Sequence, residues 1–248
     1  MNEHDWDQVA ETFEEEIFNV PAHDSRGLIN EHVKRLARPG AVVTDLGCGV
    51  GRTLPHLASL YHMVHAVDVS SRCLVVAERA CAAHGNIRYV QCDLSRGRQG
   101  YPVADVVLCI NTWLNAAPAI RAGIIDTTCR SIKRGGHLIL VVPSVESALL
   151  TTCRHVQWNR RDGMDPGKAQ RAAAMDTPGV EHGIIHIEGA PTKHYLAEEL
   201  TALLEERGLA AEVMEKLEYP WRTEFKTPPK WMKAPYPWDW FVVARRLR

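Results

Sequence analysis

One short segment combines an acidic residue with three alternating glycines: Asp45-Leu46-Gly47-Cys48-Gly49-Val50-Gly51. It ends an apolar run, residues 41–46, and precedes a helical pattern over residues 52–61. Glycines at such a strand-to-helix turn let the backbone approach a ligand closely, and the start of the helix offers free N–H groups. The carboxylate of Asp45 would repel a pyrophosphate but suits an ammonium group. The segment therefore predicts a site for a ligand with a cationic end.

A dinucleotide-binding turn is the main alternative for these glycines, and it requires the pattern G-x-G-x-x-G/A. Counted from Gly47, the last position of that pattern is Arg52, and counted from Gly49 it is Leu54. Neither residue is glycine or alanine, so the pattern does not match. Close packing of a helix on a strand would also favour glycine, but it does not explain the acidic residue.

Two further acidic residues follow apolar runs. Asp68 comes directly after residues 63–67, and an acid at the end of a second strand can accept hydrogen bonds from both hydroxyls of a ribose. Asp93 follows residues 87–92 in the same way. The alternative for Asp68 is a cap on the helix that begins near Ser70, and the alternative for Asp93 is a simple turn residue.

Alternating strands and helices must position these residues. Runs that are apolar almost throughout are typical of strands buried on both faces of a parallel sheet, and they lie at residues 41–46, 63–69, 87–92, 105–110 and 137–142. Helical patterns lie between them, at residues 52–61, 71–84 and 115–133. We expect Ser70 or Ser71 to cap the second helix, Gly85 to end it, and Gly135-Gly136 to close the third. This order predicts an α/β fold with a doubly wound, mainly parallel sheet and helices on both faces.

The residues before this core predict two short helices. They cover residues 5–19 and 25–37 and are separated by Pro21. We expect residues 1–39 to form an N-terminal helical extension that acts as a lid, and residues 40–248 to form the main domain.

After the fifth strand the alternation breaks. Residues 151–191 contain four glycines and three prolines, which indicates an insertion that covers the substrate. A helix over residues 193–207, ended by Gly208, and two final strands at residues 211–217 and 239–245 follow it. The stretch 219–238 between these strands is rich in Pro and Trp.

In the order of these motifs, residues 40–143 resemble the class I S-adenosylmethionine (SAM)-dependent methyltransferases, with looser similarity up to the last strand. The resemblance implies a seven-stranded Rossmann-like sheet, SAM as cofactor and S-adenosylhomocysteine (SAH) as its product. In that family the glycine loop holds the methionyl end of the cofactor, and the acid at the strand tip faces its amino group. By position these roles fall to Asp45, Gly47, Cys48, Gly49 and Gly51.

The same resemblance assigns the other half of the cofactor. Asp68 would bind the ribose, and Val69 would lie against the adenine ring. Asp93 would lie near the exocyclic amine of adenine, with Leu94 beside it.

The end of the fourth strand bears on the methionine part and on the acceptor. Main-chain atoms of Ile110 and Asn111 would line the methionine moiety. Family members that methylate exocyclic or amide nitrogens often carry N-P-P-[YFW] here, whereas this chain has Asn111-Thr112-Trp113, which disfavours a DNA, adenine-N6 or glutamine-amide target. We expect Trp113 to contribute to the wall of the acceptor pocket. No catalytic residue is assigned, because a base is needed only when the acceptor starts protonated.

Two weaker groups lie in and near the insertion. His182 and His186 are four residues apart, but no third ligand has a suitable spacing, so we expect structural histidines and no metal. A local basic bias fits either a solvated surface or a site for an anionic group or nucleic acid, and it comes from Arg154, Arg160, Arg161, Lys168 and Arg171.

The composition excludes several classes of protein. The 248 residues include 29 Lys and Arg against 30 Asp and Glu, a net charge of −1, so no overall field attracts nucleic acid or an anionic membrane. No apolar stretch approaches the ~20 residues that span a bilayer. The acidic, amphipathic start does not resemble a signal peptide. Seven cysteines without a C-x-x-C arrangement are typical of a reducing cytoplasm.

These patterns predict a cytoplasmic methyltransferase that moves a methyl group from SAM to an O, N or S atom of a small-molecule acceptor. One alternative is an RNA or protein methyltransferase, which would need a basic tract or a recognition domain, and the sequence shows neither. Another is a SAM-binding sensor or scaffold without turnover, since the loop and acids bind cofactor but perform no chemistry. The sequence leaves the acceptor and the oligomeric state open.

Overall fold

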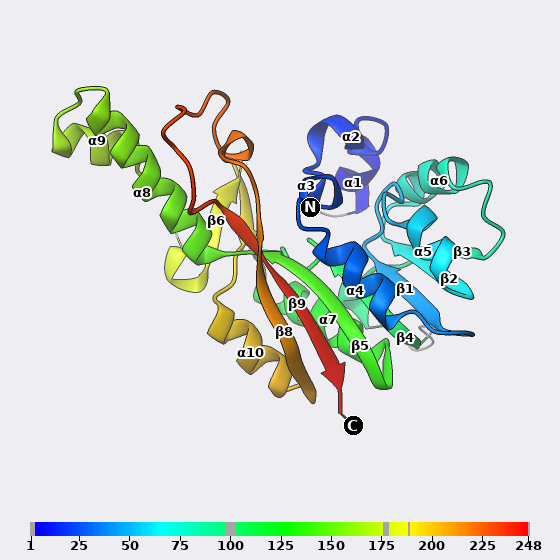
Figure 1. Cartoon of the computed structure of the whole chain (residues 1–248). Coiled ribbons are helices and arrows are strands. Elements are labelled where there is room, and N and C mark those ends of the chain that lie inside the picture. Colours follow the sequence, from blue (N-terminus) through cyan, green and yellow to red (C-terminus); the bar gives the residue numbers. More distant parts are fainter. Residues whose placement is uncertain (1–2, 98–102, 176–178, 188, 248) are drawn as a thin grey trace.

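A seven-stranded sheet organises the computed structural model, which describes residues 3–97, 103–175, 179–187 and 189–247 (Figure 1). Its strand order is β3-β2-β1-β4-β5-β9-β8. The bounds are β1 Val42–Leu46, β2 Met63–Asp68, β3 Ile87–Gln91, β4 Ala104–Ile110, β5 Ile132–Pro143, β8 Leu209–Glu218 and β9 Trp238–Arg246. In this order, each strand from β3 to β5 pairs in parallel with the next one, whereas β9 runs antiparallel to both β5 and β8. The expected doubly wound, mainly parallel sheet of seven strands is confirmed.

Helices cover both faces of the sheet. On one face lie α4 (Leu28–Leu36), α5 (Leu54–Leu60) and α6 (Ser71–Ala80), whose Val33, Leu57 and Ala77 share a buried core with Val43 and Ile139. On the other face lie α7 (Pro118–Arg130) and α10 (Ala197–Glu205), which bury apolar residues against alternate positions of the same strands. Because successive side chains of a strand point to opposite faces, near-continuous apolar strands supply both cores.

The N-terminal extension consists of short helices. The structure has α1 (Glu3–Val9), α2 (Phe13–Glu16) and α3 (Val20–His23) where one helix over residues 5–19 was expected, so that expectation is wrong. Asn19 caps α3 by accepting a hydrogen bond from the Ala22 N–H at 3.0 Å. Pro21 therefore lies in the first turn of a helix, where its missing N–H costs nothing, and does not separate two helices. Residues 3–23 are called the N-terminal lid below.

Several element ends differ from the sequence-based expectation. Ser70 does cap α6, as expected. However, Cys81 is the C-cap of this helix, and Gly85 does not adopt a left-handed conformation. Gly135 lies inside β5 rather than before it, since the strand already begins at Ile132.

The segment after β5 begins with a long helix, α8 (Val145–Arg161), followed by α9 (Pro166–Ala172). In Figure 1 these two helices project from the sheet as an arm, alongside the chain that joins β8 to β9. Two short strands, β6 (Ile184–Ile187) and β7 (Ala190–Lys193), then form a separate small sheet. Short 3-10 turns complete the order: η1 (Leu94–Arg96), η2 (Val180–His182) and η3 (Trp221–Thr223).

Basic residues of the arm hold it to the stretch between β8 and β9. Arg154 donates to the carbonyls of Lys233 and Ala234, both at 3.0 Å. The guanidinium of Arg161 lies 4.0 Å from the ring centre of Trp231. These two arginines are therefore engaged within the fold.

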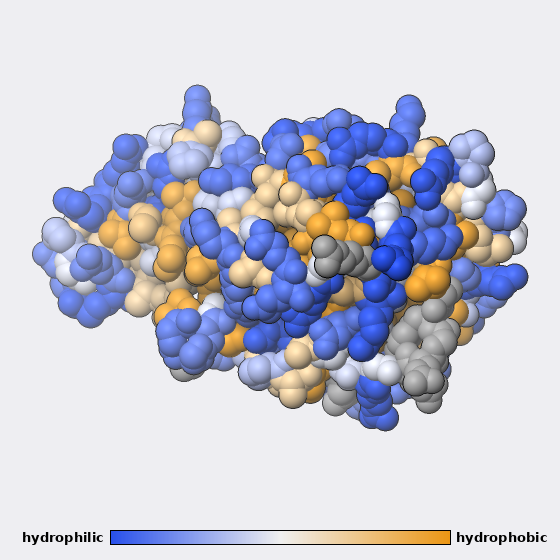
Figure 2. Space-filling model, turned by 90° about the horizontal axis from the view of Figure 1, so that it is seen from below, coloured by the Kyte–Doolittle hydropathy of each residue, from blue (hydrophilic) through white to orange (hydrophobic). Residues whose placement is uncertain are grey.

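Figure 2 shows the molecule from below, at the end where the parallel strands begin. Hydrophilic and hydrophobic residues are interspersed over this face. Within the described ranges no helix is long and apolar enough to cross a membrane.

Candidate functional site

A cavity of about 2660 Å³ lies at the edge of the sheet where the parallel strands end. Ligands of open α/β sheets bind at this edge. Ten of the eleven residues expected to hold the cofactor line it: Asp45, Gly47, Cys48, Gly49, Asp68, Val69, Asp93, Leu94, Ile110 and Asn111. Residues that are far apart in the sequence are thus brought to one place by strand order alone.

Gly51 is the expected residue that does not line the cavity. A Cβ atom on Gly51 would lie 3.0 Å from the Cβ of Ala77 and 2.9 Å from Cδ1 of Leu54, so this glycine allows the loop to pack on α6. Gly49 has a different role, because a Cβ there would point to the lid and lie 2.6 Å from Cζ of Phe13. Both glycines therefore allow close packing, Gly51 on α6 and Gly49 beneath Phe13 of the lid.

Asp68 joins the ends of two strands. Its Oδ2 accepts the backbone N–H of Gly49 at 2.8 Å, and its Oδ1 accepts that of Ser70 at 2.9 Å. The side chain of Ser70, not that of Asp68, caps α6 by accepting the N–H of Cys73 at 3.0 Å. Each carboxylate oxygen can accept a second hydrogen bond, so Asp68 keeps capacity for ligand hydroxyls.

Asp45 is a buried carboxylate, and in the described part of the chain the hydroxyl of Thr53 donates a hydrogen bond to its Oδ2. Burial raises the pKa of Asp45 to about 7, with a further contribution from nearby Asp68. Burial also raises the pKa of Asp68, although backbone N–H groups oppose this. Two buried carboxylates that disfavour each other's charge are stabilised by a cationic ligand, so the site suits an ammonium or sulfonium group.

Asn111 has a strained backbone and an unpaired side-chain oxygen. Its φ is 51°, in the left-handed region, and it is the one such non-glycine residue in the described part of the chain. Its Oδ1 is buried and has no hydrogen-bond partner. Strained residues at a cavity with an unsatisfied polar atom are typical of ligand sites. The sequence pointed only to main-chain contacts here, whereas the structure adds the side-chain oxygen.

Asp93 forms a turn at the cavity. Its Oδ1 accepts the N–H of Ser95 at 2.9 Å and its hydroxyl at 2.6 Å, while Oδ2 pairs with Nε of Arg96 at 2.9 Å. The turn role considered for Asp93 is therefore present, and its carboxylate also lines the cavity next to Leu94.

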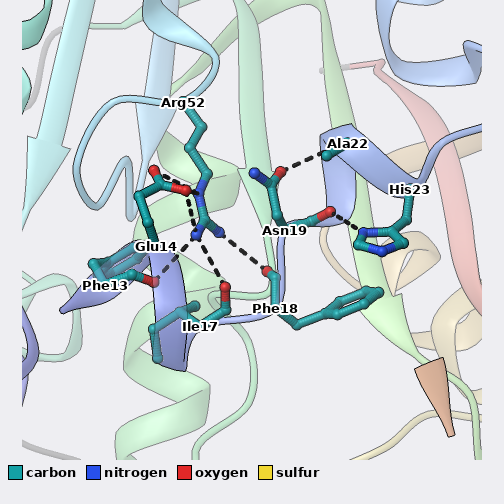
Figure 3. Close-up of polar contacts among 8 residues, drawn as sticks. All are labelled: Phe13, Glu14, Ile17, Phe18, Asn19, Ala22, His23 and Arg52. Atoms are coloured by element: carbon teal, nitrogen blue, oxygen red, sulfur yellow. Dashed lines mark hydrogen bonds and ion pairs between the residues drawn. The ribbon is translucent and has the colours of Figure 1, made fainter. Parts of the chain in front are cut away.

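Arg52 fastens the N-terminal lid, as Figure 3 shows. Its Nε donates to both carboxylate oxygens of Glu14 at 3.1 Å. Its Nη atoms donate to the carbonyls of Phe13 at 3.1 Å, Ile17 at 3.0 Å and Phe18 at 3.2 Å. One side chain directly after the glycine loop thus satisfies carbonyls at the end of α2. Sequence reasoning missed this role, since no local signal links residue 52 to a helix far upstream.

The first helix of the lid reaches the other end of the cavity. Oδ1 of Asp7 accepts the hydroxyl of Ser70 at 2.5 Å, and Glu3 accepts Nε2 of Gln91 at 2.8 Å. The lid is therefore tied to the loops after β1, β2 and β3, all of which line the cavity.

On the acceptor side, Trp113 does not line the cavity. Trp113 is fully buried and its indole N–H donates to Thr128 at 3.1 Å, so the expectation that it forms a wall of the pocket is wrong. Its neighbours Thr112 and Leu114 line the cavity instead.

His182 lies in η2 with an exposed side chain and His186 lies in β6. The described residues contain no group of three or more metal-binding side chains.

A further polar pair was missed. The hydroxyl of Tyr219 donates to Oδ2 of Asp239 at 2.8 Å, and both residues line the cavity. The signal in the sequence was an acidic residue at the start of an otherwise apolar final strand.

Comparison with known proteins agrees with this architecture. Residues 43–136 match a family model described as a methyltransferase domain. No curated protein matches the chain in sequence. The chain thus has the fold of the class I, Rossmann-like methyltransferases, and its residues 43–136 match a methyltransferase domain.

Three solved structures illustrate the similarity. A SAM-dependent methyltransferase from Methanosarcina mazei is 18% identical, with a TM-score of 0.60 over 87% of this chain and 97% of that one. The N-methyltransferase NodS from Bradyrhizobium japonicum, in complex with SAH, is 13% identical, with a TM-score of 0.60 over 98% and 99%. Magnesium protoporphyrin IX methyltransferase from Synechocystis, with bound SAM, is 16% identical, with a TM-score of 0.54 over 92% and 79%. At these identities the likeness concerns the fold.

Proposed function

We propose that this protein transfers the methyl group of SAM to an O, N or S atom of a small-molecule acceptor. The observation that carries the proposal is the convergence of ten residues, assigned from the sequence, on one cavity at the carboxyl edge of the sheet. Structures of similar fold that contain SAM or SAH, including NodS and the magnesium protoporphyrin IX methyltransferase, support the choice of cofactor.

Each residue has a role in the proposed cofactor site. Asp45 and the free Oδ1 of Asn111 face the ammonium group, and the loop from Gly47 to Gly49, with Cys48, offers backbone N–H groups to the methionine part, which Ile110 also lines. Asp68 accepts the ribose hydroxyls.

The adenine end is enclosed by three residues. Val69 packs against the ring, and Asp93 and Leu94 lie at its edge. Gly51 supports the loop from behind through its contact with α6.

The chemistry needs little beyond binding. When bound, SAM supplies an electrophilic methyl group on a positively charged sulfur. The chain orients the acceptor in line with it and keeps water out, and positioning of this kind accounts for much of the rate enhancement of such transfers.

We also propose a division of the chain into a lid and a catalytic domain. Residues 1–39 form the N-terminal extension, residues 40–248 the methyltransferase domain, and residues 151–191 a substrate lid. In support, the cavity is lined by parts of the N-terminal lid, by parts of the segment 143–192 and by Tyr219, Thr223 and Glu224. Helix α8, which contains the start of this segment, begins at Val145.

A small acceptor is favoured over RNA or protein. None of the five basic residues of the insertion lines the cavity, and Arg154 and Arg161 contact the stretch between β8 and β9. The seven cysteines are all free thiols, which suits the reducing cytoplasm as the compartment.

Calorimetry with SAM, SAH and NAD tests the cofactor. We expect binding of the two sulfur ligands and no heat from NAD. NAD binding without a response to SAH would overturn the proposal. Incubation with methyl-labelled SAM and a metabolite extract then tests turnover, since binding without any transfer would leave only the sensor or scaffold alternative.

A further inference from the structure

The acceptor side of the cavity contains a buried carboxylate with an open oxygen. Asp239 is the second residue of β9, pairs with Pro143 at the carboxyl end of β5, and is 8% exposed. Its Oδ2 accepts the hydroxyl of Tyr219, whereas within the described residues no group donates to its Oδ1. Glu224 lines the same part of the cavity.

Aromatic rings of the lid pack against Tyr219, the partner of this carboxylate. Phe18 of the lid lies edge-on to Tyr219, with ring centres 5.0 Å apart, and stacks on His23 at 4.7 Å. Trp238, the residue before Asp239, also lines the cavity, but its side chain leaves the opposite face of β9 and its ring is covered by Nζ of Lys216 at 3.7 Å, so the rings on the Asp239 side are those of Tyr219, Phe18 and His23. Aromatic faces next to a carboxylate are the usual receptors for organic cations.

The described lining of the cavity is strongly acidic. It includes ten carboxylates: Glu3, Asp7, Glu14, Glu15, Glu16, Asp45, Asp68, Asp93, Glu224 and Asp239. Its two arginines are paired, Arg52 with Glu14 and Arg96 with Asp93, and it contains no lysine. An anionic acceptor would therefore find no uncommitted cation among these residues, whereas a cationic acceptor would find Asp239 and Glu224.

The sheet places Asp239 close to Asn111, one of the residues expected to hold the cofactor. Ile110 at the end of β4 pairs with Val141 of β5, and Pro143 of β5 pairs with Asp239. At ~4.8 Å per strand, the backbones of Asn111 and Asp239 lie roughly 10 Å apart. An acceptor bound between these two residues would reach the carboxylate of Asp239 from the side of the expected cofactor site.

Building on the function proposed above, we propose that the acceptor is an amine, bound as its ammonium by Asp239 and Glu224, and that Asp239, held by Tyr219, takes up its proton. An N–H bond of the ammonium breaks, and the proton moves to the carboxylate of Asp239. The freed electron pair forms the N–C bond to the methyl group while the C–S bond breaks and its electrons stay on sulfur. The products are a methylated ammonium and neutral SAH.

The electrostatics of the pair suit this role. The pKa of Asp239 is raised to about 7. Burial is the main cause and the charge of Glu224 adds to it, whereas the hydrogen bond from Tyr219 acts in the opposite direction. The groups that face Asp239 are thus Tyr219 and Glu224. Tyr219 is in turn faced by Glu224, by His23 of the lid and by Asp24, which follows the lid. A base that titrates near neutral pH is effective in proton transfer.

The first test uses acceptors with matched carbon skeletons. The full chain is incubated with methyl-labelled SAM and 2-phenylethylamine, 2-phenylethanol or phenylacetate, and with hexylamine, hexanol or hexanoate. Transfer to an amine and to no alcohol or carboxylate supports the proposal. Transfer to an alcohol or carboxylate, or no transfer to either amine, overturns it. Calorimetry with SAH is run in parallel, because loss of SAH binding would refute the proposed function itself.

The second test uses variants with the amine that is turned over. Asp239→Asn should lower kcat/KM by about 100-fold or more, the range for loss of a general base, and leave the Kd of SAH within about threefold because the cofactor residues are untouched. Asp162→Asn, the same charge change on the exposed end of α8, is the control and should have no effect.

Tyr219→Phe separates proton uptake from a merely structural role. It removes the hydrogen bond that lowers the pKa of Asp239, so the acidic limb of the kcat/KM profile should move to higher pH. Full turnover by Asp239→Asn, or an unchanged acidic limb in Tyr219→Phe, would contradict the proposal. If Asp239→Asn does not fold, the profile of Tyr219→Phe decides alone.

Discussion

The backbone N–H of Gly49 donates to Oδ2 of Asp68 at 2.8 Å, and this bond fixes the glycine loop after β1 to the end of β2. The two sequence motifs that first indicated a cofactor are therefore one structural unit. The binding of any ligand that donates a hydrogen bond to Asp68 therefore also depends on the position of the loop. Binding of the ribose and of the methionine part should accordingly be coupled.

Replacement of Asp68 by Ala tests this unit. We expect the affinity for SAH to fall by roughly 1.5–3 kcal/mol, the range for lost hydrogen bonds to a charged group. The Gly49 and Ser70 N–H groups also lose their acceptor, so thermal stability should fall. Calorimetry on folded variant measures the first effect, with Asp162→Asn as control. Unchanged affinity would show that Asp68 only supports the loop.

The affinity for SAH should depend on pH through Asp45. Its pKa in the ligand-free protein is about 7, raised by burial, and the ligand ammonium favours the ionised carboxylate. Below pH 7, binding of SAH therefore releases the proton of Asp45. In this range the affinity for SAH should fall by roughly tenfold for each unit by which the pH is lowered. Above that value the dependence on Asp45 should level off.

The control for this prediction is Asp45→Asn, which cannot titrate. It should bind SAH more weakly and lose most of the slope between pH 5.5 and 7, a range set by the pKa of about 7. Equal slopes in both proteins would assign the pH dependence to another group.

The sequence was sufficient for the sheet and for the cofactor end of the site. Apolar runs mark buried strands, and the acids and glycines at their ends occupy positions that the strand order alone brings together. Asp45, Asp68 and Asn111 could therefore be placed on one edge before any contact was known.

Contacts between distant segments could not be predicted in this way. The bond from Tyr219 to Asp239 depends on how the chain between β8 and β9 folds back, and the contacts of Arg52 depend on where the lid lies. Trp113 shows the reverse error, since its position after β4 suggested the cavity but its side chain turns into the core. Local patterns report the period of an element, not the direction in which a loop residue points.

Replacement of Arg52 by Ala should release the N-terminal lid. Arg52 makes hydrogen bonds to Phe13, Ile17 and Phe18, and its side chain is 14% exposed. We expect faster proteolysis within residues 3–23 and weaker SAH binding, by about tenfold, since loss of ordering contacts of ~1–2 kcal/mol has that effect. Limited proteolysis and calorimetry measure the two results.

Two variants sharpen this experiment. Arg79→Ala, an exposed arginine of α6, should change neither result. Glu14→Gln should have only a small effect, because the Glu14 side chain is 63% exposed and its ion pair is screened by water. A lid that stays resistant to protease in Arg52→Ala would show that Asp7 and Phe13 hold it without the arginine.

At the other end of the sheet, Asp105 should make stability dependent on acid pH. It accepts hydrogen bonds from Nζ of Lys133 and Nη2 of Arg38, both at 2.8 Å, and from the Val42 N–H at 3.0 Å. Burial raises the pKa of Asp105, but these donors outweigh burial and lower it to about 2. The unfolded chain has a pKa of about 3.9 at this residue. The folded state thus favours the ionised carboxylate, and the stability gained is complete above about pH 4 and disappears as the pH falls toward 2.

Asp105→Asn should therefore lower the free energy of unfolding by about 1–2 kcal/mol at neutral pH, the lower part of the range because both cations are partly exposed. Urea unfolding at pH 7 and at pH 3 measures this difference in the free energy of unfolding. The difference should be smaller at pH 3, because the carboxylate of the unfolded wild type, with a pKa of about 3.9, is then mostly protonated and the ionised folded state is less favoured. Asp162→Asn, an exposed residue at the end of α8, should unfold like the wild type at both pH values. An equal loss for Asp105→Asn at both pH values would mean that shape and the Val42 hydrogen bond, and not the charge of Asp105, stabilise this edge of the sheet.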